Sequence, residues 1–112
     1  MAELDFFEIL LTNLSPESKW FLVILRSQKE PINKIQLQEL VNKSYIKNEH
    51  EKQNFNATPL ISSRHLLDIH LARLEGPGLV QVKELGRMRL YSITILGKQL
   101  LEYMKTSKHE TN

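Results

Sequence analysis

The chain has 112 residues, of which 41% are hydrophobic and 25% charged, a composition typical of one soluble globular domain and too short for a second core. It contains no cysteine, which excludes disulfide bonds, thiol catalysis and the usual zinc-finger ligands. No apolar run approaches the roughly 18 residues of a membrane span, and Glu3, Asp5 and Glu8 lie where a signal peptide would be positively charged. We therefore expect a cytoplasmic protein without a membrane segment.

The formal net charge is only +2, but the basic residues are unevenly distributed. Residues 1–61 carry seven Lys and Arg against eight Asp and Glu, whereas residues 62–112 carry eight against five. A phosphate-contacting surface needs such an excess, although a shift of this size also arises by chance. Charge alone is therefore weak support for nucleic-acid binding by the second half of the chain.

Two helices are predicted near the start of the chain. Apolar residues at helical spacing predict an amphipathic helix over residues 3–13. Ser15 and Pro16 then indicate a new helix, with serine as N-cap and proline at the first helical position. This second helix is apolar on most sides and ends before Pro31, so we expect it to be central.

A short extended segment and a third helix follow. Asn33 can cap a helix over residues 34–43. Residues 44–59 are polar and exceed the roughly 2–8 residues that usually connect helices in a bundle. This stretch is either a short extra helix over residues 45–53 or a mobile loop, and its Glu and Lys content favours the helix.

The helix predicted over residues 62–75 is amphipathic. Ser62 or Ser63 can cap it, and three leucines at i, i+4 and i+7 spacing form its core face: Leu67, Leu71 and Leu74. A step of 100° per residue places four other residues together on the opposite, exposed face: Arg64, His65, Asp68 and Ala72.

The first turn of this helix suits contact with the major groove, where Arg64 and His65 could reach base edges. Asp68 would repel phosphates, so it is tolerable only if it accepts from a cytosine amino group or braces a neighbouring arginine. The alternative is that this face is the ordinary solvated side of a surface helix.

A β-hairpin is predicted next. Residues 76–78, Gly-Pro-Gly, end the helix, and strands over residues 79–83 and 88–94 flank a turn at Gly86. Two arginines spaced by two on a strand point to the same side, and a lysine lies on the partner strand: Arg87, Arg89 and Lys83. These cations suit a minor groove or its flanking phosphates, although charges on an edge strand also prevent aggregation.

Thr94 is predicted to cap a last helix that extends to about residue 106. Gly97 lowers helix propensity in its first turn, so we expect a close backbone contact there. The chain thus forms one domain over residues 1–106, with a helix at 3–13, a core at 15–94 that includes a polar insert at 44–61, a helix at 94–106, and a tail at 107–112.

Residues 71–101 carry two motifs that resemble those of known regulator families. The segments Leu74–Val80 (LEGPGLV) and Tyr91–Gly97 (YSITILG) resemble the Leu-Glu-x-x-Gly-Leu-Val turn and the Tyr-x-Leu-Thr-x-x-Gly element of MarR-, ArsR- and PadR-type prokaryotic regulators, with isoleucine for leucine in the second. The resemblance implies a mainly helical winged helix-turn-helix with a small β-hairpin wing and extra N- and C-terminal helices.

The resemblance further implies a homodimeric transcriptional regulator that binds double-stranded DNA. The residues predicted to contact DNA lie on the helix at 62–75 and on the wing: Ser62, Ser63, Arg64, His65, Asp68, Lys83, Arg87 and Arg89. The long 44–61 segment departs from those regulators and is similar to the winged-helix module of archaeal origin-recognition initiators, so an origin- or plasmid-binding protein is a second hypothesis. A third is a protein-interaction module, which the modest net charge and Asp68 favour.

Surplus apolar surface at the two ends of the chain predicts the homodimer interface. The residues expected there come from the first and last helices: Leu4, Phe7, Leu11, Leu96, Leu100 and Met104.

Catalysis, cofactors and metals are not expected. His65 and His70 are about 140° apart on a helix, a poor arrangement for sharing a metal ion. The sequence has no Gly-x-Ser-x-Gly, P-loop or paired-carboxylate motif of an enzyme.

Overall fold

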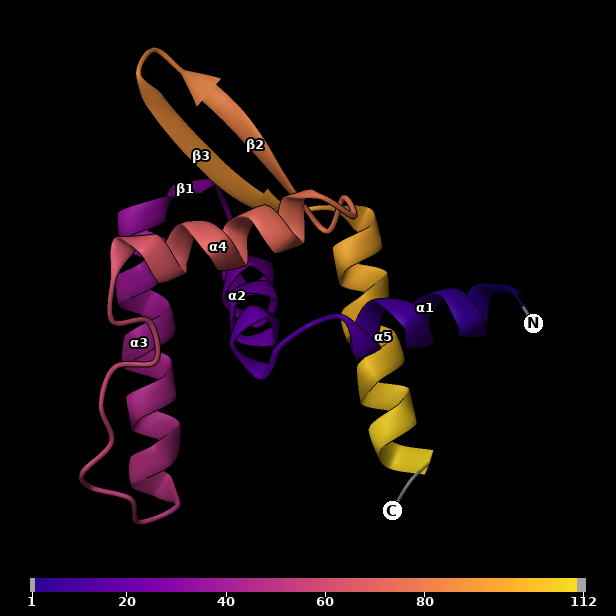
Figure 1. Ribbon diagram of the computed structural model, residues 1–112, viewed down its shortest axis with the longest axis horizontal. Helices are drawn as coiled ribbons and strands as arrows, with labels where there is room; N and C mark the ends of the chain where they lie inside the picture. The colour runs from indigo at the N-terminus through magenta and orange to yellow at the C-terminus, as the bar shows by residue number, and fades with distance from the viewer. Residues whose placement is uncertain (1, 111–112) are drawn as a thin grey trace.

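The computed structural model describes residues 2–110, and the side chains of residues 6–106. Its elements, in order, are α1 (Ala2–Thr12), α2 (Pro16–Ser27), β1 (Ile32–Asn33), α3 (Lys34–Glu51), α4 (Arg64–Glu75), β2 (Val80–Leu85), β3 (Met88–Ile93) and α5 (Ile95–Glu110). The strands form one antiparallel sheet in the order β1-β3-β2. This arrangement is a winged helix-turn-helix, as predicted: α3 and α4 form the helix-turn-helix, and the β2-β3 hairpin projects beside α4 as the wing (Figure 1).

The core is centred on α2, which contacts α3, α4, α5 and β3. Phe21 and Leu22 of α2 are fully buried because neighbouring elements cover the helix on several sides. The leucines predicted for the core face of α4 are buried as well: Leu67, Leu71 and Leu74. These contacts hold α4 by one face and leave its other face outward.

Side-chain caps fix where the helices begin. Ser15 accepts from the Ser18 N–H at 3.2 Å, and Asn33 exchanges hydrogen bonds with Gln36 in a capping box. Thr94 accepts from the Gly97 N–H at 3.0 Å at the start of α5. These caps were predicted from local sequence and are confirmed.

The helix favoured over residues 45–53 is present as far as residue 51, but the prediction that it is separate from the helix before it was wrong. α3 continues without a break from Lys34 to Glu51, because neither glycine nor proline interrupts it. The chain then returns through a loop whose end is anchored at buried Ile61. The Ile61 N–H donates to Asn42 Oδ1 at 2.7 Å, and the Ile61 carbonyl accepts from the Asn42 and Gln38 amides.

The last helix is longer than predicted. α5 extends to Glu110, so the tail expected at residues 107–112 is helical as far as the structure describes it. The close contact expected at Gly97 is confirmed: a Cβ there would lie 2.4 Å from the Leu79 carbonyl oxygen and 2.6 Å from Ile93 Cγ1. Over residues 2–110, no helix combines enough length with enough hydrophobicity to span a bilayer.

Candidate nucleic-acid interface

The outer face of α4 is open to solvent along its length. Arg64, His65, Asp68 and Ala72 are all exposed, as the sequence predicted. Ser62 and Ser63 precede the helix and are also exposed. Ser63 is the N-cap and accepts from the Leu66 N–H at 3.2 Å, so its hydroxyl orders the first turn that presents Arg64.

Both acidic residues of α4 are paired with cations from other elements. The Lys34 Nζ, on α3, lies 3.1 Å from Asp68 Oδ1. Arg89 Nη2, on β3, lies 3.4 Å from Glu75 Oε1. The carboxylates that would repel phosphate are therefore partly neutralised. The sequence suggested that Asp68 might brace an arginine, but its partner is a lysine 34 positions earlier.

The wing presents its cations in different directions. Gly86 makes the turn with φ of +64°, a conformation that glycine adopts without strain. Lys83 pairs in register with Leu90, and Arg89 with Glu84, so Lys83 and Arg89 lie on opposite faces of the hairpin. Arg89 braces the wing against α4: it contacts Glu75 and lies 5.7 Å from the centroid of the Tyr91 ring.

Arg87 lies in the hairpin turn and is exposed. Among the described residues it forms no ion pair or hydrogen bond, so its guanidinium is available to a partner. Arg87 and Arg89 both line one cleft, but Arg87 lies in the turn and not on the return strand with Arg89.

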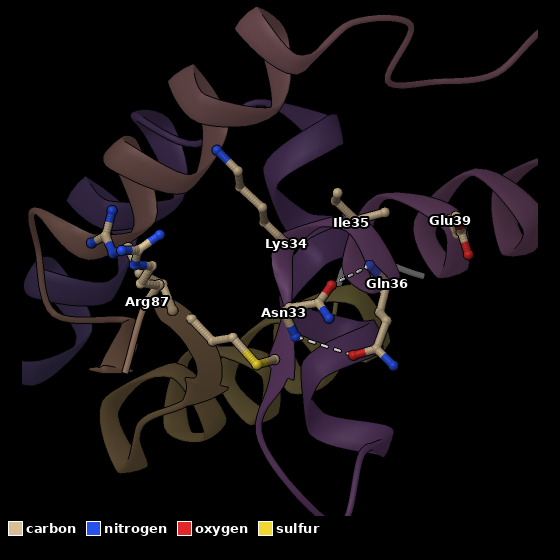
Figure 2. A pocket seen from close by; sticks show the side chains of 8 residues that line it. Asn33, Lys34, Ile35, Gln36, Glu39 and Arg87 are labelled. Atoms are coloured by element: carbon tan, nitrogen blue, oxygen red, sulfur yellow. Dashed lines mark hydrogen bonds between the residues drawn. The ribbon is translucent and has the colours of Figure 1, made fainter. Parts of the chain in front are cut away.

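This cleft, of about 520 Å³, separates the start of α3 from the wing. Its lining combines three cations with one carboxylate and a mixed polar and apolar floor: Asn33, Lys34, Ile35, Gln36, Glu39, Arg87, Met88 and Arg89. Figure 2 shows the capping bonds between Asn33 and Gln36 on one side of the cleft and the Lys34 side chain extending away from them. The cleft thus adds positive charge between the start of α3 and the wing tip.

Most residues predicted for the dimer interface pack against the core of their own chain. Leu100 is fully buried in the core of its own chain, so its assignment to a dimer surface was wrong: α5 uses that side to pack against α2. Four others are partly buried against the same core: Phe7, Leu11, Leu96 and Met104. The Leu4 side chain lies outside the described residues.

Other apolar side chains at this end of the molecule are exposed. Phe6 and Ile9 on α1 are 46% and 60% exposed, and Ile95 at the start of α5 is 76% exposed. α1 is held against α5 by a stacked contact between Phe7 and Tyr103, whose centroids are 5.3 Å apart. The Tyr103 hydroxyl also donates to the Glu8 carboxylate.

The two histidines of α4 occupy different environments. His65 is exposed, whereas His70 is only 6% exposed and its Nδ1 lies 3.3 Å from the Ser18 hydroxyl. Burial lowers the pKa of His70; Glu17 opposes this shift and Arg73 adds to it. Among the described side chains, those of residues 6–106, no three His, Asp or Glu groups converge as metal ligands would.

Comparison with known proteins adds independent information. No family model matches the chain. A curated protein of Bacillus cereus (strain ATCC 10987 / NRS 248), "DNA-binding protein TubR", is 33% identical over 116 aligned positions, which cover 100% of this chain and 93% of the relative. The chain belongs to the TubR family. This likeness supports the prokaryotic winged-helix assignment at the coarse level, without selecting among MarR-, ArsR- and PadR-type regulators.

Proposed function

We propose that this protein binds double-stranded DNA, with the outer face of α4 in the major groove and the wing against the flanking backbone. One observation carries the proposal. The exposed face of α4 presents Arg64 and His65, while both acidic residues of the helix are held by cations from α3 and β3. The TubR relative, named as a DNA-binding protein, supports the same conclusion.

Each part of this surface has a distinct role in the proposed complex. Arg64 lies in the first turn of α4, from which it can contact a base edge or a phosphate. Ser62 and His65 assist beside it, and Ser63 holds the turn through its cap. Lys83 and Arg87 contact phosphates from the wing, whereas Arg89 positions the wing through Glu75.

We further propose that the biological role is transcriptional regulation in the cytoplasm of a prokaryote, in the manner of MarR-, ArsR- or PadR-type proteins. Binding at a replication origin or on a plasmid is the second candidate. Recovery and sequencing of the DNA fragments bound in cells would separate them. Sites at promoters support regulation, and sites confined to an origin or plasmid locus support the second role.

We also propose a homodimer that uses the end of the molecule formed by α1 and α5. The exposed apolar side chains of Phe6, Ile9 and Ile95 support this interface, because a partner subunit could cover them. Light scattering over a range of concentrations tests it. A dimeric mass that Ile9→Lys reduces would support the interface, and a monomeric mass at every concentration would contradict it.

Gel-shift titration against mixed genomic DNA at two salt concentrations tests DNA binding itself. We expect binding that weakens steeply with salt, since lysines and arginines displace counterions from phosphates. Arg64→Ala with Arg87→Ala should weaken it, whereas Arg26→Ala should not, because Arg26 lies on α2 and pairs with Glu102 of α5 at 3.8 Å. Absence of binding at low salt would favour a protein-interaction module instead.

A further inference from the structure

The ion pair between Lys34 and Asp68 links two helices on the proposed DNA-binding surface. Its two side chains are 42% and 58% exposed, so the pair is open to solvent. Exposed pairs contribute on the order of 0–1 kcal/mol to folding. This contact therefore contributes little to the stability of the fold, and its location suggests a role in recognition.

The pair also affects Arg64. Arg64 lies one helical turn before Asp68, and residues spaced by four on a helix have Cβ atoms roughly 5–6 Å apart. An arginine and an aspartate at this spacing can pair with each other. In the structure the carboxylate contacts Lys34 instead, and Arg64 forms no ion pair or hydrogen bond among the described residues. Lys34 thus competes with Arg64 for the carboxylate.

We infer that Lys34 is a positioning residue for base recognition: it holds the Asp68 carboxylate so that Asp68 accepts from a cytosine amino group and Arg64 stays free to donate to a guanine. This inference rests on the proposed function. Lys34 contacts Oδ1, and no hydrogen bond occupies Oδ2 among the described residues. The cytosine N4 amino group is a major-groove donor that a carboxylate oxygen can accept, and guanine N7 and O6 are the acceptors that arginine prefers.

Electrostatics favours the same arrangement. A lone carboxylate on this face would repel the phosphates on both sides of the groove. The ammonium group of Lys34 offsets that charge and reaches Asp68 from α3 rather than from α4 itself. Asp68 is then tolerated near phosphate while it keeps a free acceptor atom.

Selection from duplexes with a randomised central segment tests the inference. For the wild type we expect a cytosine and a guanine at two fixed positions of the selected site. Asp68→Asn should change the cytosine position towards adenine, because an asparagine amide pairs with adenine N6 and N7. Lys34→Met should reduce discrimination at both positions by about fivefold or more, equivalent to about 1 kcal/mol.

Two controls make the result specific to the pair. Lys43→Met removes an exposed lysine from the same helix, nine residues further on, and should lower overall affinity no more than Lys34→Met while leaving base preference unchanged. In an Asp68→Ala background, Lys34→Met should have no further effect on base preference, because its partner is absent. Urea denaturation of each variant checks that the fold is retained.

The outcomes separate this inference from the proposed function. If the wild type selects a site but Lys34→Met and Asp68→Asn leave its base preference unchanged, the role of the pair is overturned and DNA binding stands. If the wild type binds no duplex at low salt, both are overturned. Loss of base preference in Lys34→Met alone, with Lys43→Met unaffected, supports the inference.

Discussion

The inner face of α4 places Leu67, Leu71 and Leu74 at no more than 2% exposure, whereas its outer face presents Arg64 and Asp68 to solvent. The inner face determines where the helix lies against α2, and the outer face determines what the helix can contact. Substitutions on the two faces should therefore have separable effects: stability from the inner face, and DNA affinity from the outer one.

The largest effect is expected on the inner face. Leu67→Ala removes a fully buried side chain and should lower the free energy of unfolding by about 2–5 kcal/mol, the range for such cavities. Urea denaturation followed by circular dichroism measures the change. His65→Ala, two residues earlier on the outer face, is the control and should stay within about 0.5 kcal/mol; equal losses in both variants would contradict the assignment of faces.

The outer face should show the reverse behaviour. Arg64→Ala should weaken binding to a selected site by about tenfold or more, as expected for loss of a good base contact, and should relax sequence preference. Its urea midpoint should match that of the wild type, because Arg64 is exposed. Fluorescence anisotropy measures affinity, and an unchanged dissociation constant would remove Arg64 from the interface.

The wing should contribute a smaller and sequence-independent share. Arg87→Ala should reduce affinity several-fold for every duplex and should lower the slope of log K against log salt by about 1, as expected for one lost phosphate contact. Affinity measured at several salt concentrations gives the slope. A slope equal to that of the wild type would show that Arg87 does not contact phosphate.

The smallest predicted effect concerns the two histidines of α4 and the dependence of stability on pH. Burial lowers the pKa of His70, so the unfolded chain takes up a proton as pH falls below about 6.5 while the folded chain does not. The free energy of unfolding should therefore decrease as pH falls from 7 to the lowered pKa of folded His70. His70→Gln should remove this part of the pH dependence, and His65→Gln should retain it. Equal pH dependence in wild type and His70→Gln would contradict the argument.

Local sequence determined much of the fold and of the candidate site. The caps of α4, at Ser62 or Ser63, and of α5, at Thr94, and the leucine spacing on α4 depend on neighbouring residues, so the sequence alone predicted them. A close backbone contact at Gly97 was also predicted, but its partner, the Leu79 carbonyl, is distant in the sequence. The length of α3 was underestimated because its second half is polar. This polarity suggested a connection after residue 43, but no glycine or proline ends the helix there.

Contacts between distant segments could not be predicted in the same way. Lys34 was missed because only the tertiary structure brings the start of α3 to Asp68 on α4. Leu100 was assigned to a dimer surface because the apolar residues of α5 could pack either against a partner or against their own chain. Only the tertiary structure shows which of them α2 covers. Spacing along one helix identifies a face, but the neighbour of that face is a property of the whole fold.

Amide hydrogen exchange of the whole chain, with and without a bound duplex, tests the central claim most directly. We predict slower exchange in the first turns of α4 and at the wing tip around Arg87, with α1 unchanged by DNA. Protection confined to α1 and α5, with α4 and the wing unaffected, would contradict the assignment of this surface to DNA.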